Sequence, residues 1–76
     1  MDIAEKIFEV FRETLQVSAD EPRENIVYQE TKNWDSIAHM TLVAGLEEAF
    51  DCMLDTDDIL DMSNFNKAVE IMGKYQ

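Results

Sequence analysis

Residues 35–50 read DSIAHMTLVAGLEEAF, and this stretch decides the fold class. Its apolar side chains recur with a helical period, and at about 100° per residue one group of them falls on a single side. Asp35 precedes the group and is a good N-cap residue. The pattern therefore predicts a helix from about Ser36 to Phe50. Its core-facing side is expected to carry Leu42, Val43, Leu46 and Phe50.

A second apolar stripe follows another side of the same helix, with members spaced at helical intervals. This stripe, called the apolar strip below, consists of Ile37, Met40 and Ala44. Acidic residues stand at its head and along its flank; this acidic rim consists of Asp35, Glu47 and Glu48. A helix that is apolar on two sides either is buried on both or offers one side to a partner. The strip is therefore either a docking surface or a contact with the loop that precedes the helix.

The segments on either side of this helix also have helical periodicity. Residues 2–16 predict an amphipathic helix whose apolar side carries Ile3, Ala4, Ile7, Phe8, Val10, Phe11 and Leu15. Thr56 is suited to cap a short helix that ends at residue 61 or 62. Ser63 is suited to cap a last helix, whose apolar side carries Phe65, Ala68, Val69, Met72 and Tyr75.

Residues 17–35 lose this periodicity and contain several loop-forming residues. A connection of this length is unusual in a small domain and must be pinned to the core. Its candidate anchors are Val17, Ile26, Tyr28 and Trp34. Because alternating strand patterns are absent, we expect an all-α fold in a single domain spanning residues 1–76. The expected architecture is a small four-helix bundle with three longer helices, a short third helix and a long loop between the first two.

Charge excludes several classes of function. The chain has 76 residues with 6 basic and 17 acidic side chains, which gives a formal net charge of −11. Nucleic-acid binding and adhesion to anionic membranes both need basic faces, so neither partner is expected. An acidic protein is instead drawn toward basic protein surfaces. No apolar run approaches the roughly 18 residues of a membrane helix, and Cys52 has no cysteine with which to pair. We expect a monomeric cytoplasmic protein without membrane insertion.

Few residues are suited to catalysis or metal binding. Ser36 and His39 lie three positions apart and can approach on a helix, but the sequence provides neither an oriented base nor an oxyanion site. His39 is instead expected at the rim of the core face. The acidic residues between positions 51 and 61 lack the glycine and glutamate spacing of an EF-hand loop. The pattern predicts a solvated acidic face, no specific metal site and a non-catalytic chain.

Residues 35–51 resemble the signature of acyl carrier proteins. That family carries Asp-Ser-Leu, then spaced aliphatic residues, then Leu-Glu-acidic-x-Phe. This chain has Asp35-Ser36-Ile37 followed at the same spacings by Leu42, Leu46, Glu47, Glu48 and Phe50. The resemblance extends over the whole chain, because the first helix, long loop, serine, short acidic third helix and last helix fall in the family's order.

The resemblance implies that Ser36 receives 4′-phosphopantetheine from coenzyme A, transferred by a phosphopantetheinyl transferase (holo-acyl-carrier-protein synthase). The thiol of the arm would then hold acyl groups as thioesters and present them to enzymes of fatty-acid, polyketide or related lipid biosynthesis. Asp35 would be the acidic neighbour of this phosphoprotein site. The positions that would meet the basic docking patches of partner enzymes are Ile37, Met40, Ala44, Glu47 and Glu48.

Three positions depart from the family pattern. Trp34 stands where the family usually has glycine, and Ala38 and Thr41 stand where housekeeping carriers often have acids. The departures favour a specialised stand-alone acyl carrier. The cargo stays open between a fatty acid, a polyketide intermediate and an aminoacyl group. Two alternatives are an aminoacyl or peptidyl carrier domain and an acidic helical adaptor that is never modified.

Methionines are expected to fill gaps in the interior, because their side chains are flexible and apolar. The residues concerned are Met53, Met62 and Met72. We expect the seam between the helices to open for an attached acyl chain, with Met62 near its mouth.

Overall fold

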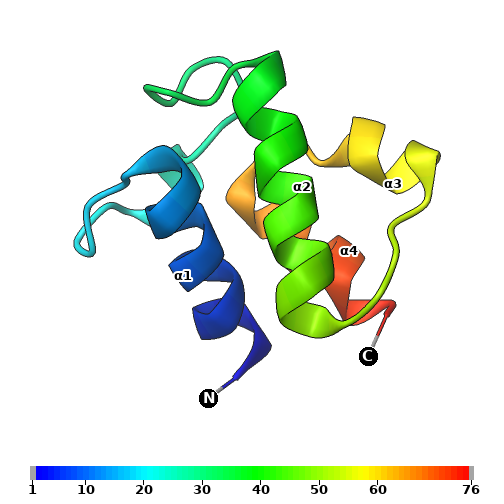
Figure 1. The fold of residues 1–76 in the computed structure, drawn as a ribbon. Helices are drawn as coiled ribbons and strands as arrows, with labels where there is room; N and C mark the ends of the chain where they lie inside the picture. Colours follow the sequence, from blue (N-terminus) through cyan, green and yellow to red (C-terminus); the bar gives the residue numbers. More distant parts are fainter. Residues whose placement is uncertain (1, 76) are drawn as a thin grey trace.

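Helix α2 runs from Ser36 to Phe50, where the apolar period predicts it. The computed structural model describes residues 2–75, and its other helices are α1 (Ile3–Leu15), α3 (Thr56–Asp61) and α4 (Phe65–Gly73) (Figure 1). A short 3-10 helix, η1 (Arg23–Asn25), lies between α1 and α2. Within residues 2–75 there is no β-strand, and one isolated bridge joins Val27 to Asn64. The predicted all-α class is therefore confirmed.

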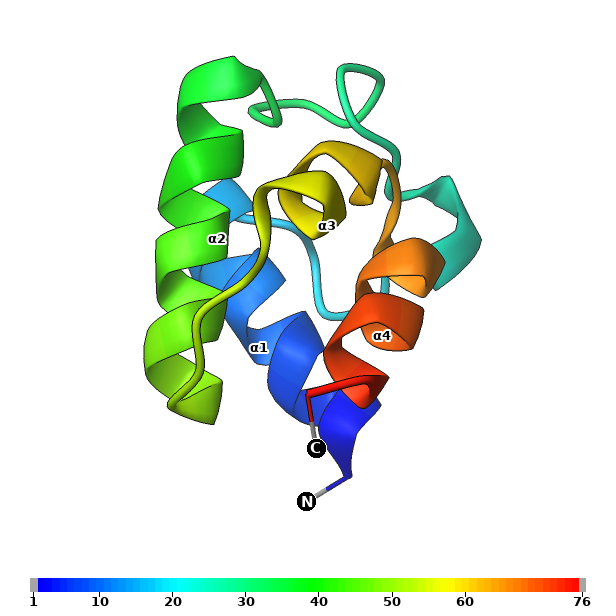
Figure 2. The same cartoon turned by 90° about the vertical axis from the view of Figure 1, so that its right-hand side faces the viewer.

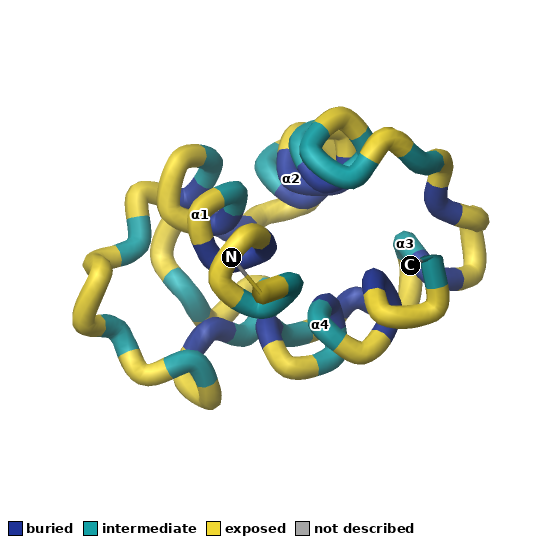
Figure 3. The backbone as a smooth tube through the Cα atoms, turned by 90° about the horizontal axis from the view of Figure 1, so that it is seen from below, coloured by how far each residue is buried: buried dark blue, intermediate teal, exposed yellow. Residues whose placement is uncertain are grey.

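Helix α1 is the centre of the packing, because it contacts both α2 and α4. Figures 1 and 2 show α3 beside α2, on the side away from α1. In Figure 3 the buried residues lie on the sides of the helices that face one another, and the outer sides are exposed. None of the helices in the described chain has the length and apolarity that a membrane crossing requires.

The core is built around aromatic side chains contributed by three parts of the chain. The ring of Phe11 meets that of Trp34 edge-on at 5.2 Å and that of Phe65 at 5.1 Å between centroids. Phe8 meets Phe65 in the same way at 5.7 Å. Such edge-to-face pairs are favourable beyond the apolar area that they bury. They join α1, α4 and the end of the long loop in one cluster.

Two of the four predicted anchors pin the long loop by complete burial. Ile26 is 0% exposed and Trp34 is 1% exposed, whereas Val17 and Tyr28 are half-buried. Backbone hydrogen bonds add to the attachment: the N–H of Tyr28 donates to the carbonyl of Ser63 at 2.9 Å, and that of Phe65 donates to the carbonyl of Ile26 at 3.0 Å. The loop is thus tied to the segment before α4.

The predicted caps of the last two helices are each wrong by one residue. Helix α3 has Asp55 as its N-cap residue and Thr56 at its first helical position. Helix α4 is capped by Asn64, whose Oδ1 accepts a hydrogen bond from the N–H of Lys67 at 2.7 Å. Ser63 lies one residue before this cap, and its carbonyl is occupied by the loop. Asparagine is as good an N-cap residue as serine, so composition alone does not decide between them.

Burial also departs from the prediction at two apolar residues. Met53 is 83% exposed, although it is expected in the core, and Ile71 is 2% exposed, although the predicted face of the last helix omits it. Met53 lies in the turn between α2 and α3, where helical periodicity gives no guidance. Met62 and Met72 are buried as expected.

Gly45 lies at a close approach of α2 to α1. A Cβ added there would lie 3.0 Å from Cγ1 of Val10, a stiff β-branched side chain. Alanine is better than glycine in a helix by roughly 1 kcal/mol, but overpacking costs about 1–3 kcal/mol. We therefore expect Gly45→Ala to lower the free energy of unfolding, measured by urea denaturation.

Gly73→Ala is the matched control for this substitution. A Cβ at Gly73 would meet nothing within 4 Å, so this variant is expected to gain stability from helix propensity alone. An equal gain in both variants would contradict tight packing at Gly45.

Candidate functional site

The serine singled out by the sequence occupies the first position of α2. Asp35 forms the N-cap, and its Oδ1 accepts a hydrogen bond from the N–H of Ala38 at 2.8 Å, as predicted. Both Asp35 and Ser36 are exposed. Because the Asp35 carboxylate makes the cap, the Ser36 hydroxyl is not needed for it. Ser36 lies at the positive end of the helix dipole.

The apolar strip lies open on the outer side of α2. Ile37 is 79% exposed, Met40 is 56% exposed, and Ala44 is also exposed. The interpretation that the long loop covers this strip is therefore wrong. A contiguous row of exposed apolar side chains is unusual on a small monomeric protein and marks an interaction surface more often than scattered ones do.

The two glutamates of the acidic rim differ in their environments. Glu48 is exposed, whereas Glu47 is half-buried and its Oε2 accepts a hydrogen bond from the N–H of Leu54 at 2.9 Å. Glu47 therefore also fixes the turn that leads into α3. With Asp51, both lie at the C-terminal end of α2, whose own last turn contains no basic residue. The Lys6 ammonium of α1 lies 4.7 Å from the centroid of the Phe50 ring at this end. Acids are unfavourable at that end of a helix dipole.

Two further exposed apolar side chains escaped the sequence reasoning. Met53 is 83% exposed and Leu60 is 76% exposed. Leu60 follows Ile59, which is half-buried. Helix α3 has only six residues, so its sequence gives too short a period to show which of the two faces the core.

His39 is more deeply buried than a rim position implies, at 9% exposure. Its Nδ1 accepts a hydrogen bond from the indole Nε1–H of Trp34 at 3.0 Å, and its Nε2 contacts the carbonyl oxygen of Ile59 at 2.8 Å. Both ring nitrogens are thus engaged away from Ser36. The Ser36–His39 pair considered from the sequence does not form.

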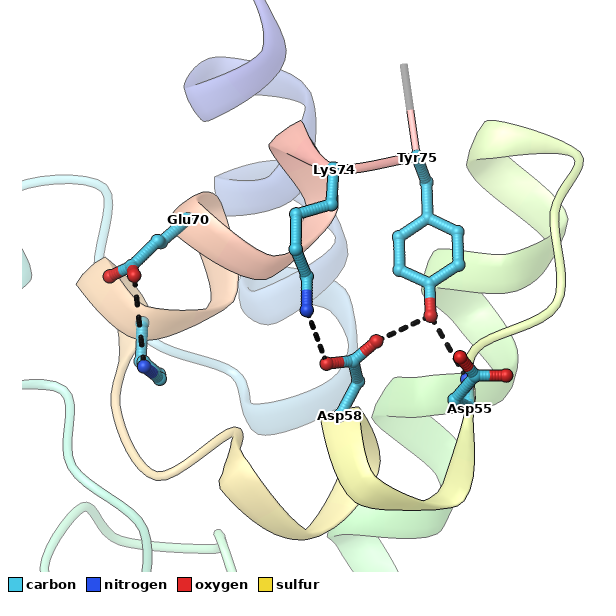
Figure 4. A network of polar contacts seen from close by, with 6 residues as sticks. Asp55, Asp58, Glu70, Lys74 and Tyr75 are labelled. Carbon is cyan, nitrogen blue, oxygen red and sulfur yellow. Dashed lines mark hydrogen bonds and ion pairs between the residues drawn. The ribbon is translucent and has the colours of Figure 1, made fainter.

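One acid of the predicted solvated face is instead buried and paired. Asp58 in α3 is 8% exposed, and its Oδ1 lies 2.6 Å from the Lys74 ammonium (Figure 4). Its Oδ2 accepts a hydrogen bond from the Tyr75 hydroxyl at 2.5 Å, and that hydroxyl accepts one from the N–H of Asp55 at 3.0 Å. This network fastens α3 to the end of α4.

The network shifts the pKa values of its members in opposite directions. The hydrogen bond from Lys74, then that from Tyr75, lowers the pKa of Asp58. The hydrogen bonds to Asp58 raise the pKa of Lys74 and the pKa of Tyr75. A lowered carboxyl pKa contributes stability that is lost as the pH falls through it, and raised Lys and Tyr pKa values contribute stability that is lost as the pH rises through them. The network therefore stabilises the fold between these acidic and alkaline limits.

We expect Asp58→Asn to lower the melting temperature by several degrees at neutral pH, because it leaves Lys74 without its carboxylate partner. The difference from wild type should shrink in acid, once Asp58 itself is protonated. Thermal melts across the acid range measure this difference. Asp57→Asn is the matched control, since Asp57 is the exposed neighbour in the same first turn and its neutralisation removes only the helix-dipole contribution, about 0.3–1 kcal/mol, that both acids share. If the two variants have the same melting temperature, the Asp58 network does not stabilise the attachment of α3 to the end of α4.

Cys52, which follows Asp51, is a free, half-buried thiol. Burial, followed by the charges of Glu47 and Asp51, raises the pKa of this thiol. It therefore stays protonated at neutral pH and is a poor nucleophile. Among residues 2–75, no three side chains of the His, Cys, Asp and Glu types converge as metal ligands.

The interior seam is closed in this structure. Leu42, Leu46, Met62 and Met72 are each at most 1% exposed. A surface hollow of about 400 Å³ lies elsewhere, on the α1 side, lined by Glu9, Arg12, Glu13, Gln16 and Val17. An acyl chain would enter the seam only if a helix moved.

Comparison of the chain with protein-family models, with curated proteins and with solved structures finds no match. The role of the Ser36 end of α2 must therefore be inferred from its own residues and geometry.

Proposed function

We propose that this chain is an acyl carrier protein, modified on Ser36 with 4′-phosphopantetheine from coenzyme A. The observation that carries the proposal is an exposed serine at the start of a helix whose outer side presents the exposed apolar strip. The arm would supply a thiol that holds acyl groups as thioesters. Partner enzymes of fatty-acid, polyketide or related lipid biosynthesis would act on those groups.

The start of α2 suits a phosphodiester on Ser36. In the proposed transfer, the Ser36 Oγ attacks the phosphorus that bears the pantetheine arm, and the bond from that phosphorus to the rest of coenzyme A breaks. The hydroxyl proton goes to a base of the transferase, and the adenosine bisphosphate part leaves. The first backbone N–H groups of a helix and its positive dipole end favour the resulting negative charge. Asp35 holds this turn in place through its bond to Ala38.

The surface beside Ser36 suits a basic partner with an apolar pocket. Ile37 and Met40 would enter the pocket, and Glu48 would meet its basic border. Acids at the C-terminal end of α2 cost stability, and the net charge of −11 adds repulsion. This loss of folding stability is expected where the same acids contribute to binding a basic partner surface. The transferase and the acyl-transferring enzymes would use the same surface.

The proposal also covers the oligomeric state of the chain, its location, its detailed architecture and its lack of catalysis. The chain would act as a monomeric cytoplasmic carrier, and the helices with their long first loop would form the small four-helix bundle that the resemblance implies. Chemistry on the cargo would be performed by the partner enzymes, because a carrier needs only to hold and present a thioester. The engagement of both His39 nitrogens elsewhere supports this division of roles.

The proposal is tested by incubating the chain with coenzyme A and a broad-specificity phosphopantetheinyl transferase and then measuring its intact mass. A gain equal to one 4′-phosphopantetheine supports the carrier. The absence of any gain, with a reference carrier modified in parallel, would overturn it in favour of an unmodified acidic adaptor.

A further inference from the structure

The imidazole of His39 is held in one protonation state by its two hydrogen bonds. The Trp34 indole N–H can only donate, so the Nδ1 atom that it reaches at 3.0 Å must be unprotonated. A carbonyl oxygen can only accept, so the Nε2 atom 2.8 Å from Ile59 O must carry the hydrogen. Both contacts therefore require the neutral imidazole with its hydrogen on Nε2.

These two bonds connect three segments that are far apart in the chain. Trp34 ends the long loop, His39 lies one turn into α2, and Ile59 belongs to α3. The Trp34 ring is nearly parallel to the imidazole, at 23° with the centroids 5.8 Å apart, and the centroid of the Tyr28 ring lies 5.0 Å from that of the imidazole. Helix α3 has few backbone contacts with the other helices. Its attachment therefore depends strongly on side chains, with His39 on one side and the Asp58 network on the other.

We infer that His39 is a proton-sensitive latch that holds the end of the long loop against α2 while the imidazole is neutral. The bond from Nε2–H to the carbonyl of Ile59 persists when the imidazole is protonated, so the contact with α3 is kept. Protonation would place a second N–H, on Nδ1, against the N–H of Trp34. Neither donor can accept, and Trp34 is only 1% exposed, so water cannot readily replace the lost partner. The latch would then open at the end of α2 that carries Ser36. This inference does not require that Ser36 be modified.

The carboxylates that lie next to these two bonds in the sequence already accept hydrogen bonds from other groups. On α2, the Asp35 carboxylate bonds to the N–H of Ala38. On α3, the Asp58 carboxylate is occupied by Lys74 and Tyr75. From the loop, Tyr28 presents an aromatic ring. Addition of a proton at Nδ1 is the event that opens the latch.

The test follows the indole N–H resonance of ¹⁵N-labelled, unmodified chain as the pH falls from about 7.5 to about 5. Trp34 is the only tryptophan, so one signal reports on the bond. In wild type we expect this signal to shift and its exchange with solvent to rise about tenfold or more, because a buried hydrogen bond is lost. The backbone N–H of Gln29, which donates to the carbonyl of Trp34, should lose protection over the same pH range, whereas the amide protons of α3 should keep theirs.

His39→Gln is the matched control, because a glutamine amide can accept from Trp34 and donate to Ile59 without titrating. Its indole signal should stay constant over the same range. A constant wild-type signal, or a Gln variant that follows the wild-type curve, would overturn the latch. Should this variant fail to fold, the ¹⁵N shifts of His39, the only histidine, decide instead. A hydrogen on Nε2 at about pH 7.5 supports the latch, and a hydrogen on Nδ1 overturns it.

Discussion

Ser36→Ala is expected to abolish loading with 4′-phosphopantetheine completely while leaving the fold intact. The hydroxyl oxygen is the nucleophile in the proposed transfer, and alanine has none. The N-cap of α2 is made by Asp35, so its bond to Ala38 survives the change. Because Ser36 is exposed, the free energy of unfolding should change by no more than about 0.5 kcal/mol. Intact-mass measurement reports the loading, and urea denaturation reports the stability.

Ser63→Ala is the control for this loss. Ser63 is also exposed and lies near the start of a helix, but it is one residue before the cap of α4, whereas Ser36 is the first residue of α2, and it has no apolar strip beside it. It should be loaded as fast as wild type. Loading of the Ser36→Ala variant would show that another residue takes the arm.

Met40→Glu is expected to reduce the kcat/KM of the transferase by about tenfold or more at every salt concentration. The substitution puts a charge into the centre of the proposed apolar contact, where central anchors each contribute about 1–2 kcal/mol or more. Met40 is 56% exposed, so the core should not be disturbed. The rate of loading, measured by mass over time, gives the effect.

Thr41→Glu is the matched control, because it adds the same charge one residue along an exposed part of α2. The resemblance places acids at this position in other carriers, so loading should be unchanged or faster. Equal losses in Met40→Glu and Thr41→Glu would mean that charge, not position, matters, and that the apolar strip is not the contact.

The contribution of the acidic rim is best tested at Glu48. Glu47 also holds the N–H of Leu54, so its replacement would disturb the turn before α3 as well as the surface. Glu48→Lys changes only an exposed charge. It should slow loading chiefly at low salt, because exposed charges act mainly on the encounter rate and are screened by ions.

Much of the helical framework was predictable from the sequence. The bounds of α2, the cap at Asp35 and the anchoring of the loop by Ile26 and Trp34 all follow from local chemistry and apolar spacing. Both interpretations of the apolar strip fitted its spacing equally well. Only the tertiary arrangement, which leaves Ile37 uncovered, excludes contact with the loop.

The polar connections of α3 were not predictable. Asp58 stands among several acids, and nothing local distinguishes it from Asp57; its partners lie 16 and 17 residues further along the chain. The same holds for His39, whose contact with Ile59 spans 20 residues. Such pairs depend on how the helices meet, and periodicity within one helix contains no information about that.

The measurement that tests the central claim most directly is peptide mass spectrometry of the wild-type chain after incubation with coenzyme A and a broad-specificity transferase. Trypsin cuts after Lys32 and Lys67, and the peptide of residues 33–67 between them contains all of α2 and α3. We predict that this peptide gains the mass of one 4′-phosphopantetheine and that its fragment ions place the group on Ser36. An unmodified peptide, while a reference carrier in the same reaction is loaded, would contradict the account, as would modification at any other hydroxyl.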